Sequence, residues 1–266
     1  MKRVRAKKSL GQHFLIDLSV AQRIASTLDG FVGQPVLEVG PGMGVLTEFL
    51  LSKGHDLTVV ELDRESVAYL EARFPTLGSR IIGADFLHLD LKKVYGDEKF
   101  CVIGNYPYNI SSQIFFKVLD YKDQVTCCSG MLQREVAQRI TAQPGSKTYG
   151  ILSVLLQAWY DAEYLFTVYE NVFNPPPKVK SGVIRLTRNK TTDLGCDEQL
   201  FKKVVKMAFG QRRKTLRNSL SGLISGEPTG LNEAFFRRRP EQLSVSEFVE
   251  LTNVIAKSNP KAEETR

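Results

Sequence analysis

The residues best equipped for chemistry form one short run, Asn105-Tyr106-Pro107-Tyr108. The amide offers a hydrogen-bond acceptor and a donor, the proline fixes the backbone, and the phenol offers an aromatic face. Together these groups suit a flat polar heterocycle, and adenine is the obvious candidate. The same composition is typical of a simple turn, because Asn and Pro are common turn formers. The surrounding sequence has to decide between the two interpretations.

The position of this run favours a ligand site. It follows the apolar residues 100–103, a predicted buried strand, and precedes a predicted helix that Ser111 or Ser112 caps. In an open α/β sheet, ligands bind at the carboxyl ends of the strands. We therefore expect Asn105 and Tyr108 to contact a ligand.

A glycine loop predicts a second part of the same site. The strand 35–39 opens into Gly40-Pro41-Gly42-Met43-Gly44, and a helix follows from Val45. Glycine lets the backbone turn tightly and approach a ligand closely. The third glycine comes one residue early for a dinucleotide fingerprint. However, the next strand ends at Glu61, roughly 20 residues after Gly40, where a Rossmann-type sheet places the carboxylate that binds ribose.

The third predicted strand, residues 80–86, also ends in a carboxylate. Asp85 is placed to accept a hydrogen bond from an adenine amino group, with Phe86 or Leu87 against the ring; a turn acid is the alternative. Asp63 is expected to be solvated or to cap a helix. The four cysteines show no Cys-x-x-Cys spacing and the three histidines are scattered, so we expect neither a metal site nor a disulfide framework.

The charge distribution indicates a polyanionic partner. The net charge is +7, and basic residues gather in segments 1–8, 202–217 and 237–239. Any one of these segments could be a solvated face, but the three together favour nucleic acid. We interpret residues 1–8 as a flexible basic arm rather than a transit peptide. No apolar run is long enough for a membrane span or a signal sequence, so a cytoplasmic protein without a membrane partner is expected.

Two domains are predicted. Residues 1–190 carry the predicted strands, and residues 191–266 show only helical periodicity and carry two of the three basic segments. In the first domain, the stiff proline loop 172–179 is expected to place Phe173 beside the site, although a triple proline often marks only a linker. The residues after about 258 are expected to be frayed.

With these residues identified, the chain resembles the rRNA adenine N6-dimethyltransferase family over nearly its whole length, most closely its bacterial 16S rRNA branch. The motifs that carry the resemblance are GQHFL at 11–15, EVGPG at 38–42, ELD at 61–63, NYPYNI at 105–110, FNPPPKV at 173–179 and QRRKTLRNSL at 211–220. Two residues depart from the family pattern. Tyr106 stands where Leu is usual, and His13 stands where Asn is frequent.

The resemblance implies a Rossmann-like class I methyltransferase sheet of the α/β class with a small C-terminal all-helical domain, and S-adenosylmethionine as cofactor. The implied cofactor contacts are His13 and Leu15 at the methionine end, Gly40 and Gly42 beneath it, Glu61 at the ribose, Asp85 at the adenine, and Asn105 between cofactor and target base.

The implied reaction is N6,N6-dimethylation of two adjacent adenosines near the 3′ end of 16S rRNA, in the immature 30S subunit and as part of its biogenesis. Asn105 would accept N6–H, Pro107 would hold the loop, and Tyr108 and Phe173 would stack on the extruded base. No metal is needed, and a monomer is expected. The alternatives are a 23S rRNA adenine-N6 methyltransferase, a DNA adenine methyltransferase, and a non-catalytic assembly or nucleic-acid-binding factor on the same fold.

Overall fold

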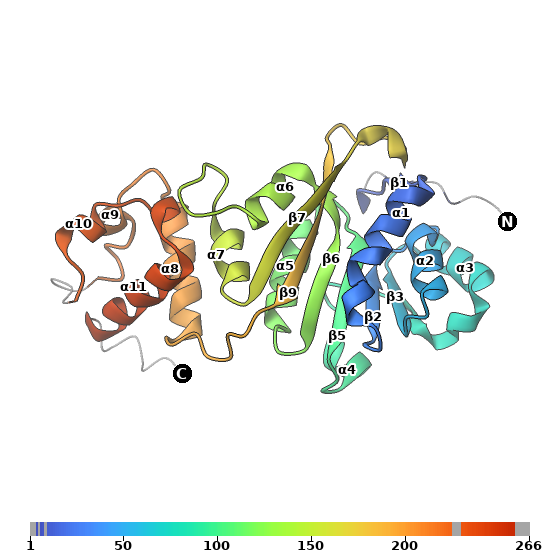
Figure 1. The fold of residues 1–266 in the computed structure, drawn as a ribbon, viewed down its shortest axis with the longest axis horizontal. Helices are drawn as coiled ribbons and strands as arrows, with labels where there is room; N and C mark the ends of the chain where they lie inside the picture. Colours follow the sequence, from blue (N-terminus) through green and yellow to red (C-terminus); the bar gives the residue numbers. More distant parts are fainter. Residues whose placement is uncertain (1–3, 5, 8–9, 225–229, 259–266) are drawn as a thin grey trace. The chain divides into compact units, whose positions relative to one another are not determined.

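A seven-stranded sheet organises the first part of the chain (Figure 1), in the order β4-β3-β2-β5-β6-β9-β7. The computed structural model describes residues 4, 6–7, 10–224 and 230–258. Five neighbouring strands are parallel, and β9 runs antiparallel to β6. The strands are β2 (Val36–Val39), β3 (Leu57–Glu61), β4 (Ile81–Gly83), β5 (Phe100–Asn105), β6 (Val125–Gln133), β7 (Tyr160–Val168) and β9 (Ser181–Arg188).

The strand order places a ligand crevice between β2 and β5. Along the sheet the chain runs outward from β2 to β3 and β4, and then returns to β5 on the other side of β2. At such a switch point the loops after the two central strands diverge and leave a crevice at their carboxyl ends. The glycine loop follows β2, and Asn105 is the last residue of β5. The predicted α/β Rossmann-like fold is confirmed.

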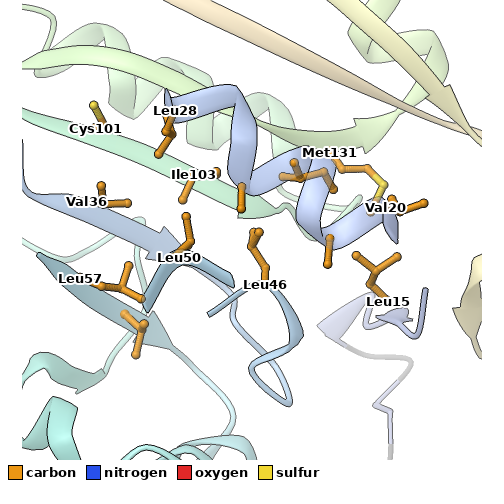
Figure 2. Packing of buried hydrophobic residues seen from close by; sticks show 14 of the residues in the cluster. Leu15, Val20, Leu28, Val36, Leu46, Leu50, Leu57, Cys101, Ile103 and Met131 are labelled. Carbon is orange, nitrogen blue, oxygen red and sulfur yellow. The ribbon is translucent and has the colours of Figure 1, made fainter. Parts of the chain in front are cut away.

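Helices α1, α2 and α3 share a buried apolar cluster with one face of the sheet, part of which Figure 2 shows. Strands buried on both faces read as continuous apolar runs, which explains why residues 100–103 contain no polar side chain. The helices of this part of the chain are α1 (Leu18–Ala25), α2 (Val45–Ser52), α3 (Arg64–Arg73), α4 (Leu91–Tyr95), α5 (Ser111–Asp120) and α6 (Arg134–Ile140), with 3₁₀ turns η2 (Ser26–Phe31), η3 (Pro75–Arg80) and η4 (Glu170–Val172).

A small second sheet joins two segments that lie far apart in the sequence. β1 (Phe14–Leu15) pairs antiparallel with β8 (Phe173–Asn174), so that Leu15 lies opposite Phe173. The proline loop, predicted to be a rigid extended wall, therefore begins as a short strand. This pairing brings the GQHFL segment to the proline loop.

The chain divides into two compact units, Met1–Gln138 with Asp161–Arg188, and Arg139–Tyr160 with Asn189–Arg266. The second unit is helical: α7 (Ile151–Gln157), α8 (Glu198–Gly210), α9 (Leu216–Ser219), α10 (Glu233–Phe236) and α11 (Val245–Ser258), with the 3₁₀ turn η5 (Pro240–Gln242). Residues 139–160, grouped with the first domain from the sequence, pack with this unit, because Tyr149 lies against Phe209 and Arg212 donates to the Ser146 carbonyl.

Two predictions about charged residues need correction or fall outside the described chain. Asp63 occupies the N-cap position of α3 without a side-chain capping hydrogen bond, and it is buried rather than solvated and pairs with Lys7 at 2.5 Å. Lys7 also pairs with Glu65. Of the predicted basic arm only residues 4, 6 and 7 belong to the described chain, and residues 259–266, expected to be frayed, lie outside it.

Two absences hold for the described residues alone. In ranges 10–224 and 230–258 no helix has the length and apolar character needed to cross a bilayer. Within the same ranges no group of three or more His, Cys, Asp and Glu side chains is arranged to hold a metal ion.

Candidate active site

A cavity opens at the carboxyl ends of β2, β3 and β5, where the strand order requires a crevice. Its empty volume is about 1150 Å³, counting the solvent at its mouth. Residues of β1, the glycine loop, the loop after β4 and the loop after β5 line it.

Asn105 lies at the junction of the β1 segment and the β5 loop. Its Nδ2 donates a hydrogen bond to the His13 carbonyl oxygen at 3.1 Å. The donor half of the amide is therefore used within the protein. The acceptor half, Oδ1, is what Asn105 can offer to a ligand that carries an N–H group.

Tyr108 is held firmly in this loop. Its hydroxyl hydrogen-bonds the Ser181 hydroxyl at 2.5 Å, and its ring stacks on the His13 imidazole with centroids 5.5 Å apart. His13 in turn is fixed by its Nδ1–H, which donates to the Pro175 carbonyl at 2.8 Å. Burial raises the pKa of Tyr108, so the phenol stays neutral and can serve only as an aromatic face and a hydrogen-bonding group.

The glycine loop has backbone angles that favour glycine, and at Gly42 it also lies too close to a neighbour for a side chain. Gly40 and Gly42 both have left-handed backbone angles, with φ of 68° and 57°. A Cβ on Gly40 would lie 3.7 Å from Cδ of Pro107, and a Cβ on Gly42 would lie 2.9 Å from the Phe14 ring. Bare backbone at these positions leaves the floor of the cavity open to a ligand.

Glu61 is oriented by the backbone around it. One carboxylate oxygen accepts the Gly42 N–H at 3.1 Å, and the other accepts the Asp63 N–H at 2.9 Å. Burial raises the pKa of this carboxyl, and the two N–H donors act against that shift. The side chain thereby links the glycine loop to the end of β3.

Asp85 lines the cavity from the loop after β4, and its carboxylate is already hydrogen-bonded locally. One oxygen accepts the Leu87 N–H at 2.9 Å, and the other lies 2.9 Å from Nδ1 of His88. These bonds fix the carboxylate at the edge of the cavity. Contact with an adenine amino group stays a prediction.

Phe173 is the one predicted site residue that the structure does not bring to the cavity. It is 3 % exposed and belongs to the buried cluster with Leu15. Strand pairing with β1 turns its side chain into the core, so it positions β1 instead of lining the site. The predicted residues that do line the cavity are His13, Leu15, Gly40, Gly42, Glu61, Asp85, Asn105, Pro107 and Tyr108.

Glu38 lines the cavity as well, and we did not single it out from the sequence. It is 1 % exposed on β2 and accepts a hydrogen bond from the Thr47 hydroxyl at 2.6 Å. Burial raises its pKa to about 8. The available signal was an acid inside an otherwise apolar predicted strand, a combination that requires a buried partner.

The cavity suits a nucleoside that carries a polar chain. The glycine loop presents backbone without side chains, and Glu61 presents carboxylate oxygens for ribose hydroxyls. Asn105 presents its Oδ1 as a hydrogen-bond acceptor at the end of β5. These features fit S-adenosylmethionine.

Comparison with known proteins identifies consistent relatives. A family model described as ribosomal RNA adenine dimethylase matches residues 3–257. The ribosomal RNA small subunit methyltransferase A of Parabacteroides distasonis is 68 % identical over 257 residues, which cover 97 % of this chain and 96 % of the relative. The protein of the same name from Phocaeicola vulgatus is 63 % identical, covering 95 % and 90 %.

Solved structures show the same fold. A dimethyladenosine transferase from Plasmodium falciparum superimposes with a TM-score of 0.74 at 21 % identity, covering 94 % of this chain and 98 % of that one. The 23S rRNA methyltransferase ErmE superimposes with a TM-score of 0.66 at 25 % identity, covering 91 % and 99 %.

Proposed function

The chain belongs to the ribosomal RNA adenine dimethylase family, and from this premise we propose its substrate and the roles of its site residues. The protein is an S-adenosylmethionine-dependent rRNA adenine dimethyltransferase. We propose that it converts two adjacent adenosines near the 3′ end of 16S rRNA to N6,N6-dimethyladenosine in the immature 30S subunit. In this proposal the protein acts as a monomer in the cytoplasm during 30S biogenesis.

The geometry around Asn105 is the observation that carries the proposal. Its amide NH₂ is bound to the His13 carbonyl, so Oδ1 is directed to accept a hydrogen bond. The N6 lone pair of adenine is delocalised into the ring and is a poor nucleophile. An acceptor that holds N6–H at a fixed place draws this lone pair toward a reactive geometry.

The cofactor supplies an activated methyl group, and the chain's own residues orient both reactants. Gly40 and Gly42 admit the cofactor above bare backbone, and Glu61 receives the ribose hydroxyls. Asp85 receives the adenine amino group, while His13 and Leu15 border the methionine end. Positioning for in-line attack can contribute much of the rate without an acid or a metal, and the proton that N6 loses for each methyl group gained can pass to solvent.

The target adenine must leave its stack to reach Asn105. Tyr108 receives one face of the extruded base, on a ring that His13 and Ser181 already hold still. Pro107 keeps the loop rigid against Gly40. Phe173 acts through β1 by fixing Leu15, and it does not itself contact the base.

The second unit is proposed to hold RNA phosphates. Lys202, Lys203 and Lys206 lie along a hollow on α8, and Arg213 and Lys214 are exposed just after it. Not every basic residue serves this purpose. Arg238 is bound to Glu247 at 2.5 Å and to the Gln242 carbonyl, so it stabilises the fold.

The likeness to a 23S rRNA methyltransferase makes large-subunit RNA the second candidate substrate. A competition experiment distinguishes the two candidate substrates. Immature 30S particles and protein-free 23S rRNA compete for a limiting amount of labelled S-adenosylmethionine. We expect the label in 16S rRNA. Label in 23S rRNA alone would overturn the proposed substrate while leaving the methyltransferase assignment intact.

A further inference from the structure

Exposed apolar side chains lie on the two segments that meet at the pairing of β1 with β8. Among the described residues, six large apolar side chains are exposed, and four of them are Ile16 (46 %), Leu18 (59 %), Tyr169 (57 %) and Val179 (44 %). Single exposed apolar residues are ordinary on a protein surface, but a group beside a functional site marks an interaction surface. We call these four residues, with Lys178 and Lys180, the β1–β8 rim.

Hydrogen bonds join the two segments of this rim. The Ile16 N–H donates to the Val172 carbonyl at 2.9 Å, immediately beyond the pairing of β1 with β8. Figure 1 shows the segment after β7, in yellow, reaching β1. Ile16 and Leu18 therefore lie on one side of the strand pair, and the chain from Tyr169 to Lys180 forms the other.

Two bonds connect the rim to the site itself. The Pro175 carbonyl accepts from His13, and Ser181, next to Lys180, shares its hydroxyl with Tyr108. His13 and Tyr108 both line the cavity. The rim is therefore continuous with the predicted base-binding wall.

Tyr169 and Lys180 form the chemically distinctive pair of the rim. The Lys180 ammonium lies 4.6 Å from the centroid of the Tyr169 ring, and more than half of that tyrosine is exposed. The backbone of Lys180 is fixed because its carbonyl accepts the Arg134 N–H at 2.9 Å. The cation covers one face of the ring, so the other face is available to a flat group.

We propose that the β1–β8 rim binds the single-stranded RNA next to the target adenosine, with a neighbouring base stacked on Tyr169 and a phosphate at Lys180. This inference rests on the proposed function and names a subsite for it. Aromatic side chains beside lysines are the means by which proteins hold unpaired RNA, since every base has a face that can stack and every nucleotide has an anionic phosphate.

The charges of the rim agree with this occupant. Lys178 and Lys180 add positive charge to an apolar surface. Asp17, beside Leu18, caps α1 by accepting the Ser19 and Val20 N–H groups, and the amino end of the helix partly offsets its charge. Glu170, which follows Tyr169 in the chain, is half-buried and adds one negative charge to this segment.

The test compares Tyr169→Leu with Tyr169→Phe in the full-length protein. Leucine keeps an apolar side chain without a stacking face, whereas phenylalanine keeps the face and loses only the hydroxyl. Binding to immature 30S particles and to protein-free 16S rRNA is measured for each variant, and calorimetry gives the affinity for S-adenosylmethionine. We expect Tyr169→Leu to bind RNA roughly 5- to 100-fold more weakly, Tyr169→Phe to resemble wild type, and cofactor affinity to stay unchanged.

Lys180→Gln tests the phosphate contact by its effect on the salt dependence of RNA binding. The slope of log affinity against log salt concentration should fall by about 0.7, the value for one phosphate of a single strand. Lys99→Gln, at the exposed amino end of β5, and Val32→Ala, with a side chain 79 % exposed elsewhere, are the matched controls and should change neither quantity.

Three results would overturn the inference. They are wild-type affinity in Tyr169→Leu, an equal loss in Tyr169→Phe, and a loss with 30S particles but not with protein-free rRNA, which would identify a ribosomal protein as the occupant. Each leaves the proposed function standing if wild type still produces dimethyladenosine. A wild-type protein that binds RNA through Tyr169 but methylates none would instead refute the proposed function.

Discussion

Tyr106 departs from the family pattern, and two neighbouring glycines leave the space that its ring occupies. A Cβ on Gly104 would lie 3.1 Å from the Tyr106 ring, and one on Gly130 would lie 2.8 Å from it. The ring is buried, packs edge-on against Phe115, and its hydroxyl donates to the Ser129 carbonyl at 2.7 Å. The residue between Asn105 and Pro107 is thus a core anchor for the loop.

Substitution of this anchor should weaken the fold. Tyr106→Leu leaves a void beside the two glycines and removes the hydrogen bond that the hydroxyl donates, so we expect a loss of about 2–4 kcal/mol in the free energy of unfolding. Tyr106→Phe removes only the hydroxyl and should lose about 1 kcal/mol. Urea unfolding measures both variants. A Tyr106→Leu protein as stable as wild type would contradict the anchor role.

Glu38 gives the protein a defined pH dependence of stability. Its pKa is raised from an ordinary 4.5 to about 8 by burial, so the folded protein holds a proton that the unfolded chain releases. This stabilisation is complete below pH 4.5 and is lost as the pH rises toward 8, at no more than about 1.4 kcal/mol per pH unit.

Glu38→Gln keeps the shape of the side chain and cannot titrate. Between pH 5.5 and 8, wild type should lose more stability than this variant, as urea unfolding at several pH values would show. Glu61 also has a raised pKa, but it is present in both proteins and its contribution largely cancels in the comparison. Parallel pH profiles would show that Glu38 is ionised in the folded protein.

At the scale of elements, β1 packs against the glycine loop. Phe14 of β1 lies against Gly42, and the next residue, Leu15, is held by Phe173 of β8. The loop therefore depends on a strand pair formed by segments about 160 residues apart in the sequence.

Gly42→Ala tests this arrangement. The new Cβ would lie 2.9 Å from the Phe14 ring at a φ of 57°, so both the contact and the backbone are strained. We expect S-adenosylmethionine affinity to fall by at least about tenfold, corresponding to 1.4 kcal/mol, when measured by calorimetry. Adding Phe14→Leu to the Gly42→Ala protein should restore part of the affinity. Wild-type affinity in Gly42→Ala would mean that β1 does not press on the loop.

The same elements show what the sequence could and could not predict. The positions of Asn105, Glu61 and Asp85 followed from one rule, that ligands bind at the carboxyl ends of parallel strands, and all three line the cavity. The orientation of Phe173 depends on strand pairing between distant segments, which local pattern does not reveal. The burial of Asp63 depends likewise on a lysine 56 positions away in the chain.

At the scale of the whole molecule, a net charge of +7 favours RNA, but the basic residues divide into two kinds. Arg217 and Arg237 both pair with Glu233, and Arg238 pairs with Glu247. Arg213 and Lys214 are exposed after α8. The Arg238 pair is about two-thirds buried on both sides and stabilises the fold, whereas Arg213 and Lys214 are available to phosphates.

This division predicts opposite phenotypes for similar substitutions. Arg213→Gln with Lys214→Gln should raise the KM for immature 30S particles and reduce the salt dependence of binding, while the thermal midpoint stays close to that of wild type. Arg238→Gln should lower the thermal midpoint by several degrees with a smaller effect on KM. Steady-state methylation and thermal unfolding of the three proteins provide the test, and the reverse pattern would contradict it.

The most direct test of the central claim is to identify the methylated product. Wild type and Asn105→Ala are incubated with methyl-labelled S-adenosylmethionine and immature 30S particles, and the rRNA is digested to nucleosides. We predict label in N6,N6-dimethyladenosine from wild type, and a loss of at least about 100-fold with Asn105→Ala, although that variant still binds the cofactor. Absence of labelled dimethyladenosine with wild type, or its formation at the wild-type rate by Asn105→Ala, would contradict the account.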